Sequence, residues 1–145
     1  MQRERTCSMR ILLVSLMVLS AVSVGTIYAE TLDTEIRLFQ WRSIQVNAGY
    51  DIAFSGNLKD SSGNPIPHAE ILIRVDGVCP DDGLIASGIT DAKGRYFIMT
   101  EAMHWDPDGL VRANAVFFGD TKYSPSESRD QLIVVFPSAH GKSCY

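Results

Sequence analysis

The sequence predicts an all-β domain, a two-sheet antiparallel sandwich of about seven strands, preceded by an export signal. Two observations predict the sandwich: apolar residues alternate with period two in short stretches, and turn-forming residues recur about every 8 to 12 positions. No stretch after the first 29 residues holds a sustained helical period. A third observation sets those 29 residues apart, because they have the three parts of a secretory signal.

The signal begins with three arginines in the first ten residues, followed by an uncharged apolar run at 11–24 and the small residue Ala29 before Glu30. A helix that spans a membrane needs about 20 apolar residues, so this shorter run favours a cleaved signal over an anchor. We therefore expect a signal peptide at 1–29 and a mature domain at 30–145. The membrane would be a partner only if the signal stayed uncleaved.

Composition and charge exclude two classes of protein. The chain of 145 residues is 46% hydrophobic, which is too apolar for intrinsic disorder. Removal of residues 1–29 leaves 116 residues and takes the formal net charge from −4 to −6. An acidic chain of this kind is not expected to bind nucleic acid, because affinity for the phosphate backbone rests on lysine and arginine.

The first three expected strands each show alternate apolar positions. The opening strand is expected to span 36–46, with Phe39 and Trp41 on the face opposite its aliphatic residues. A turn at 60–65, rich in Asp, Ser, Gly and Pro, separates the second strand from the third. The alternating apolar residues are Ile36, Leu38, Ile44 and Val46, then Tyr50, Ile52 and Phe54, then Ile71, Ile73 and Val75.

The clearest local signal predicts a hairpin, with strands at 84–90 and 95–100 joined by a turn at 91–94. Gly94 suits the left-handed position of that turn. Alternation places two residues on each face of the second strand: Tyr96 and Ile98 on one, Phe97 and Met99 on the other.

Two further strands complete the set. Residues 110–118 alternate apolar and other side chains, a turn follows at 119–125, and residues 131–136 supply the closing strand. No internal repeat or flexible linker divides the chain, so we expect one domain.

Three phrases of the sequence, at 54–71, 88–97 and 115–128, resemble those of prokaryotic extracellular immunoglobulin-like modules and the related carboxypeptidase-regulatory-type sandwiches. The likeness spans about residues 44–136 and implies an immunoglobulin-like sandwich that acts outside the cell. The loops at 78–82 and 103–108 depart from the usual connections of these modules. If the domain has a binding site of its own, we expect it at these loops.

The turn residues in these phrases also have a mechanical interpretation. Asp60 and Asp91 can accept backbone N–H groups within their turns. Tyr123 can place its ring on the core and its hydroxyl on a nearby carbonyl, as in a tyrosine corner.

Two cysteines remain after removal of the signal, Cys79 and Cys144, and an even pair in an exported chain is a disulfide candidate. Closure of a loop of roughly 65 residues would stabilise the fold by about 3 to 5 kcal/mol. The sequence equally allows two free thiols.

Calcium is the metal that the sequence best accommodates. Asp106 and Asp108 stand two residues apart before a glycine, and Asp81 and Asp82 form a second acidic pair. The set lacks the third ligand and the distant glutamate of a full calcium loop, so ordinary turn chemistry is the alternative.

Two weaker ligand sets remain. Met99, Met103 and His104 combine donors that a cuprous ion accepts, although methionine on a strand is more often part of a core. Aromatic side chains could form a sugar-binding platform if they were exposed: Trp41, Tyr50 and Trp105.

No catalytic residues are expected. The sequence contains no nucleophile elbow, and its histidines, His68, His104 and His140, fall in a turn, a loop and the tail. We therefore expect a secreted, non-enzymatic module that binds an extracellular or envelope protein or glycan, or has a structural role there. The alternative is a small exported metal-binding or carbohydrate-binding accessory protein.

Overall fold

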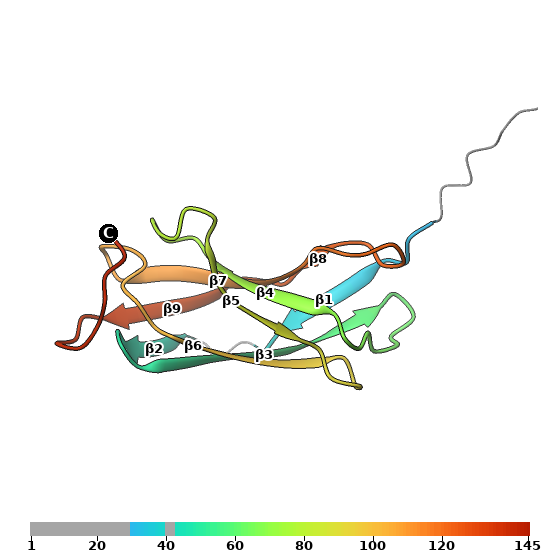
Figure 1. Ribbon diagram of the computed structural model, residues 1–145, viewed down its shortest axis with the longest axis horizontal. Helices are drawn as coiled ribbons and strands as arrows, with labels where there is room; N and C mark the ends of the chain where they lie inside the picture. Colours follow the sequence, from blue (N-terminus) through green and yellow to red (C-terminus); the bar gives the residue numbers. More distant parts are fainter. Residues whose placement is uncertain (1–29, 40–42) are drawn as a thin grey trace, which may run out of the picture.

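Nine strands in two layers make up the part of the chain that the structure, a computed structural model, describes, namely residues 30–39 and 43–145 (Figure 1). The predicted signal peptide at 1–29 and Trp41 lie outside the described residues. Among the residues described, no helix is long and apolar enough to cross a membrane. The strands are β1 (Thr34–Leu38), β2 (Ile44–Asn47), β3 (Asp51–Asp60), β4 (Glu70–Val75), β5 (Leu84–Ile89), β6 (Arg95–Glu101), β7 (Leu110–Phe117), β8 (Ser126–Glu127) and β9 (Gln131–Phe136).

The strand order confirms the predicted immunoglobulin-like sandwich. One sheet has the order β1-β3-β6, and the other has the order β2-β9-β7-β4-β5, with the short β8 paired to β7. In the immunoglobulin arrangement the first, second and fifth strands lie in one sheet, as β1, β3 and β6 do here. The third, sixth and seventh lie in the other sheet, as β4, β7 and β9 do here. The pairing differs from the expected antiparallel pattern at one place, since β2 runs parallel to β9.

The expectation of a single opening strand at 36–46 is wrong. Ile36 and Leu38 belong to β1 in the three-stranded sheet, whereas Ile44 and Val46 belong to β2 in the other sheet. Both pairs pack against the same core, from opposite sides of it. Alternation reports which side chains are buried, but it does not report the sheet to which a strand belongs.

The predicted hairpin at 84–100 is also wrong, although its turn is present. Gly94 has a φ of 68°, and its N–H donates to the carbonyl of Asp91 at 2.9 Å. The strands on either side then separate, because β5 pairs with β4 in one sheet and β6 pairs with β3 in the other.

The buried residue Thr90 explains why β5 leaves β6. Its hydroxyl donates to the carbonyl of Ile66 at 2.8 Å and accepts from the N–H of Ala69 at 2.9 Å. Its backbone N–H also donates to the carbonyl of Ala69. These bonds hold the end of β5 beside the segment that leads into β4, and so in the six-stranded sheet.

The core lies between the two sheets and follows the predicted alternation in β3, β4, β6 and β7. Its largest fully buried apolar side chains are Phe54, Leu58, Ile71, Ile73, Val111 and Ile133. The sequence thus predicted the core better than it predicted the pairing of the strands.

Inside the three-stranded sheet, the hydroxyl of Tyr96 on β6 donates to the carbonyl of Arg37 on β1 at 2.8 Å. The ring crosses Gly56 on β3, where a Cβ atom would overlap both the hydroxyl and that carbonyl. Burial raises the pKa of Tyr96. The bond from hydroxyl to carbonyl that was expected of Tyr123 is therefore made by Tyr96, while Tyr123 packs beside the core with the Lys122 ammonium 4.8 Å from its ring centroid.

Candidate functional site

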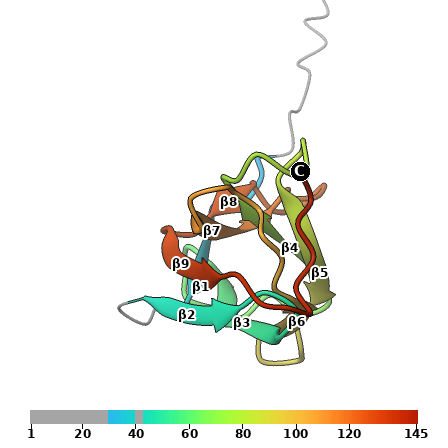
Figure 2. The ribbon, with the colours of Figure 1, turned by 90° about the vertical axis from the view of Figure 1, so that its left-hand side faces the viewer.

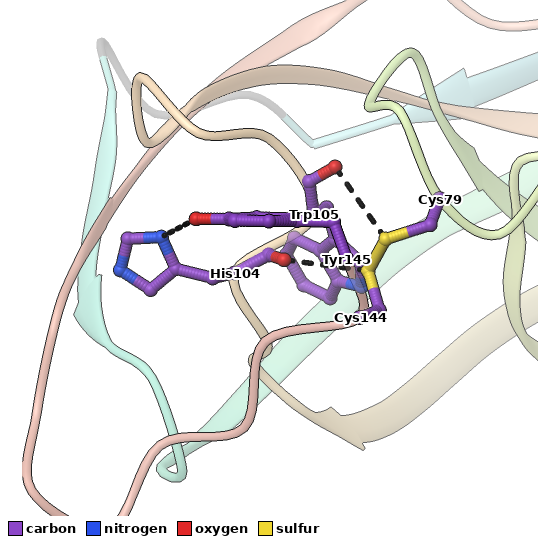
Figure 3. The surroundings of a disulfide bond; sticks show 5 residues. All are labelled: Cys79, His104, Trp105, Cys144 and Tyr145. Atoms are coloured by element: carbon purple, nitrogen blue, oxygen red, sulfur yellow. Dashed lines mark hydrogen bonds between the residues drawn. A yellow bond between two sulfur atoms is a disulfide. The ribbon is translucent and has the colours of Figure 1, made fainter.

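One end of the sandwich brings together the two loops singled out in the sequence. The loop between β4 and β5 is joined to the C-terminal tail by a disulfide between Cys79 and Cys144, whose Cα atoms are 6.0 Å apart (Figure 3). The N–H of Cys79 donates to the carbonyl of Trp105, in the loop between β6 and β7. The disulfide and this hydrogen bond together link three segments that are distant in sequence.

The C-terminal tail crosses this end of the sandwich (dark red in Figure 2). The Ser138 hydroxyl donates to the carbonyl of Ala48 at 2.6 Å. Further along, the N–H of His104 donates to the carbonyl of Lys142 at 3.0 Å, and a bridge pairs His104 with Ser143. Backbone pairing thus places Cys144 beside the loop that it helps to close.

His104 and Trp105 lie under the tail (Figure 3). The Tyr145 hydroxyl is 3.5 Å from Nδ1 of His104, and Nε2 of that ring is buried without a partner among the described residues. Sγ of Cys144 lies 3.3 Å from the carbonyl oxygen of His104, a close contact rather than a donated hydrogen bond because a disulfide sulfur carries no hydrogen. Trp105 is buried at this end, and Cys144 packs against the core.

The aromatic platform considered for sugar binding is not assembled here. Trp105 is only 2% exposed and belongs to the core, whereas Tyr50 is 59% exposed. Trp41 lies outside the described residues. Burial of Trp105 follows from the closure of this end by the disulfide and the tail.

The four candidate calcium ligands lie in two turns, where three of them accept backbone N–H groups locally. Oδ1 of Asp106 accepts from the N–H of Asp108, Oδ1 of Asp108 from Leu110, and Oδ1 of Asp82 from Leu84. Across residues 30–39 and 43–145, no group of three or more His, Cys, Asp or Glu side chains is placed to hold a metal. Calcium binding by Asp81, Asp82, Asp106 and Asp108 stays a prediction.

The three candidate copper ligands face different surroundings. Met99 on β6 is exposed, whereas Met103 packs against the core and lines a cavity of about 200 Å³ beside the disulfide. Expected burial of Met99 in the core is therefore wrong. Met99 lies instead on the outward side of β6.

The surface that sequence reasoning missed is the outward side of the three-stranded sheet. Phe39, Phe97 and Met99 are 51%, 67% and 55% exposed there. Ser55 lies opposite Phe97 in the register and accepts the N–H of Phe39, so the three residues form one row across the sheet. Ala53 and Met99 form the next row. We call this set, Phe39, Ala53, Ser55, Phe97 and Met99, the outer apolar face.

A shallow hollow adjoins the outer apolar face. Its lining includes Phe39, Ser55 and Phe97, together with Ile89 from the end of β5. Alternation in the sequence separated Phe97 and Met99 from Tyr96 and Ile98 correctly. Alternation could not show which face of β6 meets the core and which is exposed, because both faces carry large apolar side chains.

Comparisons with known proteins assign neither a family nor a function to the chain. No family model matches the chain, and no curated protein matches it. Among solved structures, it is similar to domains 4 and 5 of the S-layer protein SbsC, with 15% identity and a TM-score of 0.43 over 70% of this chain and 50% of that one. It is also similar to a chicken T-cell receptor (TCR), with 10% identity and a TM-score of 0.49 over 72% and 56%. The chain thus spans about half the length of each. At such identities these likenesses concern the fold alone, and our assignment rests on the strand order.

Proposed function

We propose that the chain is an exported, non-enzymatic immunoglobulin-like module that binds a protein partner in the cell envelope or extracellular matrix. The outer apolar face carries this proposal. Three large apolar side chains stand on one surface, and adjacent exposed groups of this kind are typical of protein interaction sites. Aromatic residues and methionine are also enriched at such interfaces.

Export is supported by the disulfide and by the first 29 residues. Disulfides form and persist in oxidising compartments outside the cytoplasm. The bond between Cys79 and Cys144 closes a loop with a sequence separation of 65, so the fold gains most where that bond can form. The charged start and short apolar run of the sequence would supply the route.

A binding role is favoured over catalysis by the use of the polar side chains. The turn aspartates described above accept N–H groups from their own loops, which is a structural task. His104 lies under the tail, while His68 and His140 lie in a turn and in the tail. The sequence adds no nucleophile motif to these positions.

The proposal is tested by a photo-crosslinking phenylalanine analogue in place of Phe97, with the same analogue in place of Lys93 as the control. Both positions are exposed, but Lys93 lies in the turn before β6 and outside the outer apolar face. In cells of the native host we expect a crosslinked adduct at position 97 and none at position 93, and the mass of the adduct identifies the partner. Absence of any adduct at 97 would contradict the proposal.

A further inference from the structure

A cavity of about 200 Å³ lies between β5 and β6 at the disulfide end of the sandwich. Nearer the turn that joins the two strands they are in close contact, since a Cβ atom at Gly88 would meet the Ile98 side chain. At the cavity, the Thr100 hydroxyl is 3.5 Å from the carbonyl of Ile85, which is at the long limit of a hydrogen bond. Both of these residues line the cavity, so a strand of each sheet bounds it.

The two loops that depart from the usual connections of such modules form the rest of the wall. Pro80 comes from the loop between β4 and β5, whereas Met103 and Trp105 come from the loop between β6 and β7. Cys144 contributes the disulfide from the C-terminal tail (Figure 3). A binding site of the domain was expected at these loops, and the cavity is a hollow that they share.

The wall is held in place by contacts between segments. The disulfide joins the first loop to the tail, and the N–H of Cys79 donates to the carbonyl of Trp105 at 3.3 Å. Gly77 lies so close to Trp105 that a Cβ atom would overlap that carbonyl. Within the first loop, the N–H of Gly83 donates to the carbonyl of Pro80 at 2.8 Å. Little of this wall has to be ordered when a ligand binds, which lowers the entropic cost of binding.

The lining is mainly apolar. Pro80 and Leu84 lie on the side of the first loop, and Met103 and Trp105 on the side of the second. Trp105 is buried and Met103 packs against the core, so this part of the wall is shielded from solvent. An apolar cavity of about 150 Å³ in a protein stays dry and takes up benzene. A methionine sulfur also makes favourable contacts with aromatic rings, so size and lining both fit a single ring.

Two polar residues of the lining select the rest of the ligand. The Thr100 hydroxyl has lone pairs that can accept a hydrogen bond from a ligand hydroxyl. Glu101 is the one charged residue among those that line the cavity, and its carboxylate opposes the entry of an anion. Any charged ligand would also lose its hydration between apolar walls. The cavity therefore favours an uncharged ligand with a hydroxyl group.

We propose that this cavity binds a small uncharged molecule with one aromatic ring and a hydroxyl group, an aromatic alcohol or a phenol. The ring lies among Ile85, Met103 and Trp105, and the hydroxyl donates to Oγ1 of Thr100. This inference is independent of the proposed function, because the cavity shares no residue with the outer apolar face.

The test titrates the exported protein, isotope-labelled in its methionine methyl groups, with benzyl alcohol and follows the methyl signals by NMR. The chain after residue 29 contains two methionines, of which Met103 lines the cavity and Met99 lies on the outer apolar face. We expect the Met103 signal to shift saturably, because a bound ring shifts nearby nuclei, and the Met99 signal to stay unchanged. Met99→Leu assigns the two signals. An unchanged Met103 signal at the solubility limit of the alcohol overturns the inference, whether or not the Met99 signal shifts.

Two variants locate the site. Leu84→Trp adds bulk to the lining and should weaken binding of benzyl alcohol by at least about tenfold. Leu132→Trp is the matched control, since Leu132 is also exposed but lies on β9 outside the lining, and it should bind as the wild type does. Melting temperatures show whether each variant is folded. A folded Leu84→Trp variant that binds like the wild type overturns the inference.

Two further ligands test the chemical class. Benzoate has the same ring with a carboxylate and should bind at least about tenfold more weakly than benzyl alcohol. Toluene lacks the hydroxyl, so Thr100→Val should weaken binding of benzyl alcohol by about three- to tenfold and leave that of toluene unchanged. Benzoate that binds as tightly as the alcohol, or a Thr100→Val variant that binds the alcohol as the wild type does, contradicts the proposed ligand class.

Discussion

The inner and outer faces of the three-stranded sheet carry the same kinds of residue in opposite surroundings. Phe54 on β3 is 1% exposed, whereas Phe97 on the neighbouring β6 is 67% exposed. Their positions in the register differ by one row, since Phe54 lies opposite Ile98 and Ser55 lies opposite Phe97. The comparison indicates that apolar side chains form the core on one face of the sheet and are exposed on the other.

The largest expected effect is the difference in stability between variants in which one of these two phenylalanines is truncated. Phe54→Ala removes a buried ring and should lower the free energy of unfolding by about 3 to 5 kcal/mol. Phe97→Ala removes an exposed ring and should change it by no more than about 0.5 kcal/mol. Denaturant titration of the two variants measures both values at a protein concentration low enough to exclude association. Equal losses would show that the outer apolar face is part of the folding core.

The stability of the core on the inner face should also depend on the disulfide at the end of the sandwich. Replacement of Cys79 and Cys144 by serine should lower the free energy of unfolding by about 3 to 5 kcal/mol, because the unfolded chain is then no longer closed into a loop. In thermal melts, the reduced wild type should likewise have a lower melting temperature than the oxidised wild type. The non-reduced wild type should be lighter by two hydrogens in mass spectrometry. Two alkylatable thiols in native exported material would contradict the pairing.

The sequence predicted the inner face well because burial in a sheet repeats every second residue. Ile52, Phe54, Ile71 and Ile73 are buried as alternation required. The turn residues Asp60 and Asp91 are also confirmed, since their carboxylates accept N–H groups of the residues that follow them. The burial pattern and the turn hydrogen bonds depend on residues that are close together in the sequence, so they can be predicted from it.

The features that the sequence did not predict depend on distant residues. The split of the opening strand, the separation of β5 from β6 and the role of Tyr96 all follow from contacts across the fold. Gly56 is the signal that could have found the last of these, because a glycine inside a strand often marks the close approach of another group. Exposure of Phe97 and Met99 had no local signal, since a large apolar residue on a strand is usually buried.

Thr90 offers a test of why β5 joins the six-stranded sheet and does not pair with β6, which carries Phe97 and Met99 of the outer apolar face. Thr90→Val keeps the shape of the side chain but leaves the N–H of Ala69 and the carbonyl of Ile66 without this partner. The free energy of unfolding should fall by about 1 to 3 kcal/mol. Thr90→Ser retains the hydroxyl and should lose less. A Thr90→Val variant as stable as the wild type would show that the hydrogen bonds at Thr90 do not hold β5 in place.

The smallest effect concerns Asp91, in the turn at the exposed end of β6. Hydrogen bonds from the Arg95 side chain, with backbone N–H groups of Arg95 and Lys93, lower the pKa of Asp91 to about 2. Because the pKa of the folded state lies below that of the unfolded chain, the carboxylate stabilises the fold above about pH 4, and this contribution is lost as the pH falls towards 2. Asp91→Asn should therefore lower the melting temperature slightly at neutral pH and not at all near pH 2. Arg95→Lys, which keeps the charge but not the forked geometry, should reproduce part of the effect. Melting curves recorded between these two limits measure it, and a difference between wild type and Asp91→Asn that grew on acidification would reverse the sign and refute the assignment.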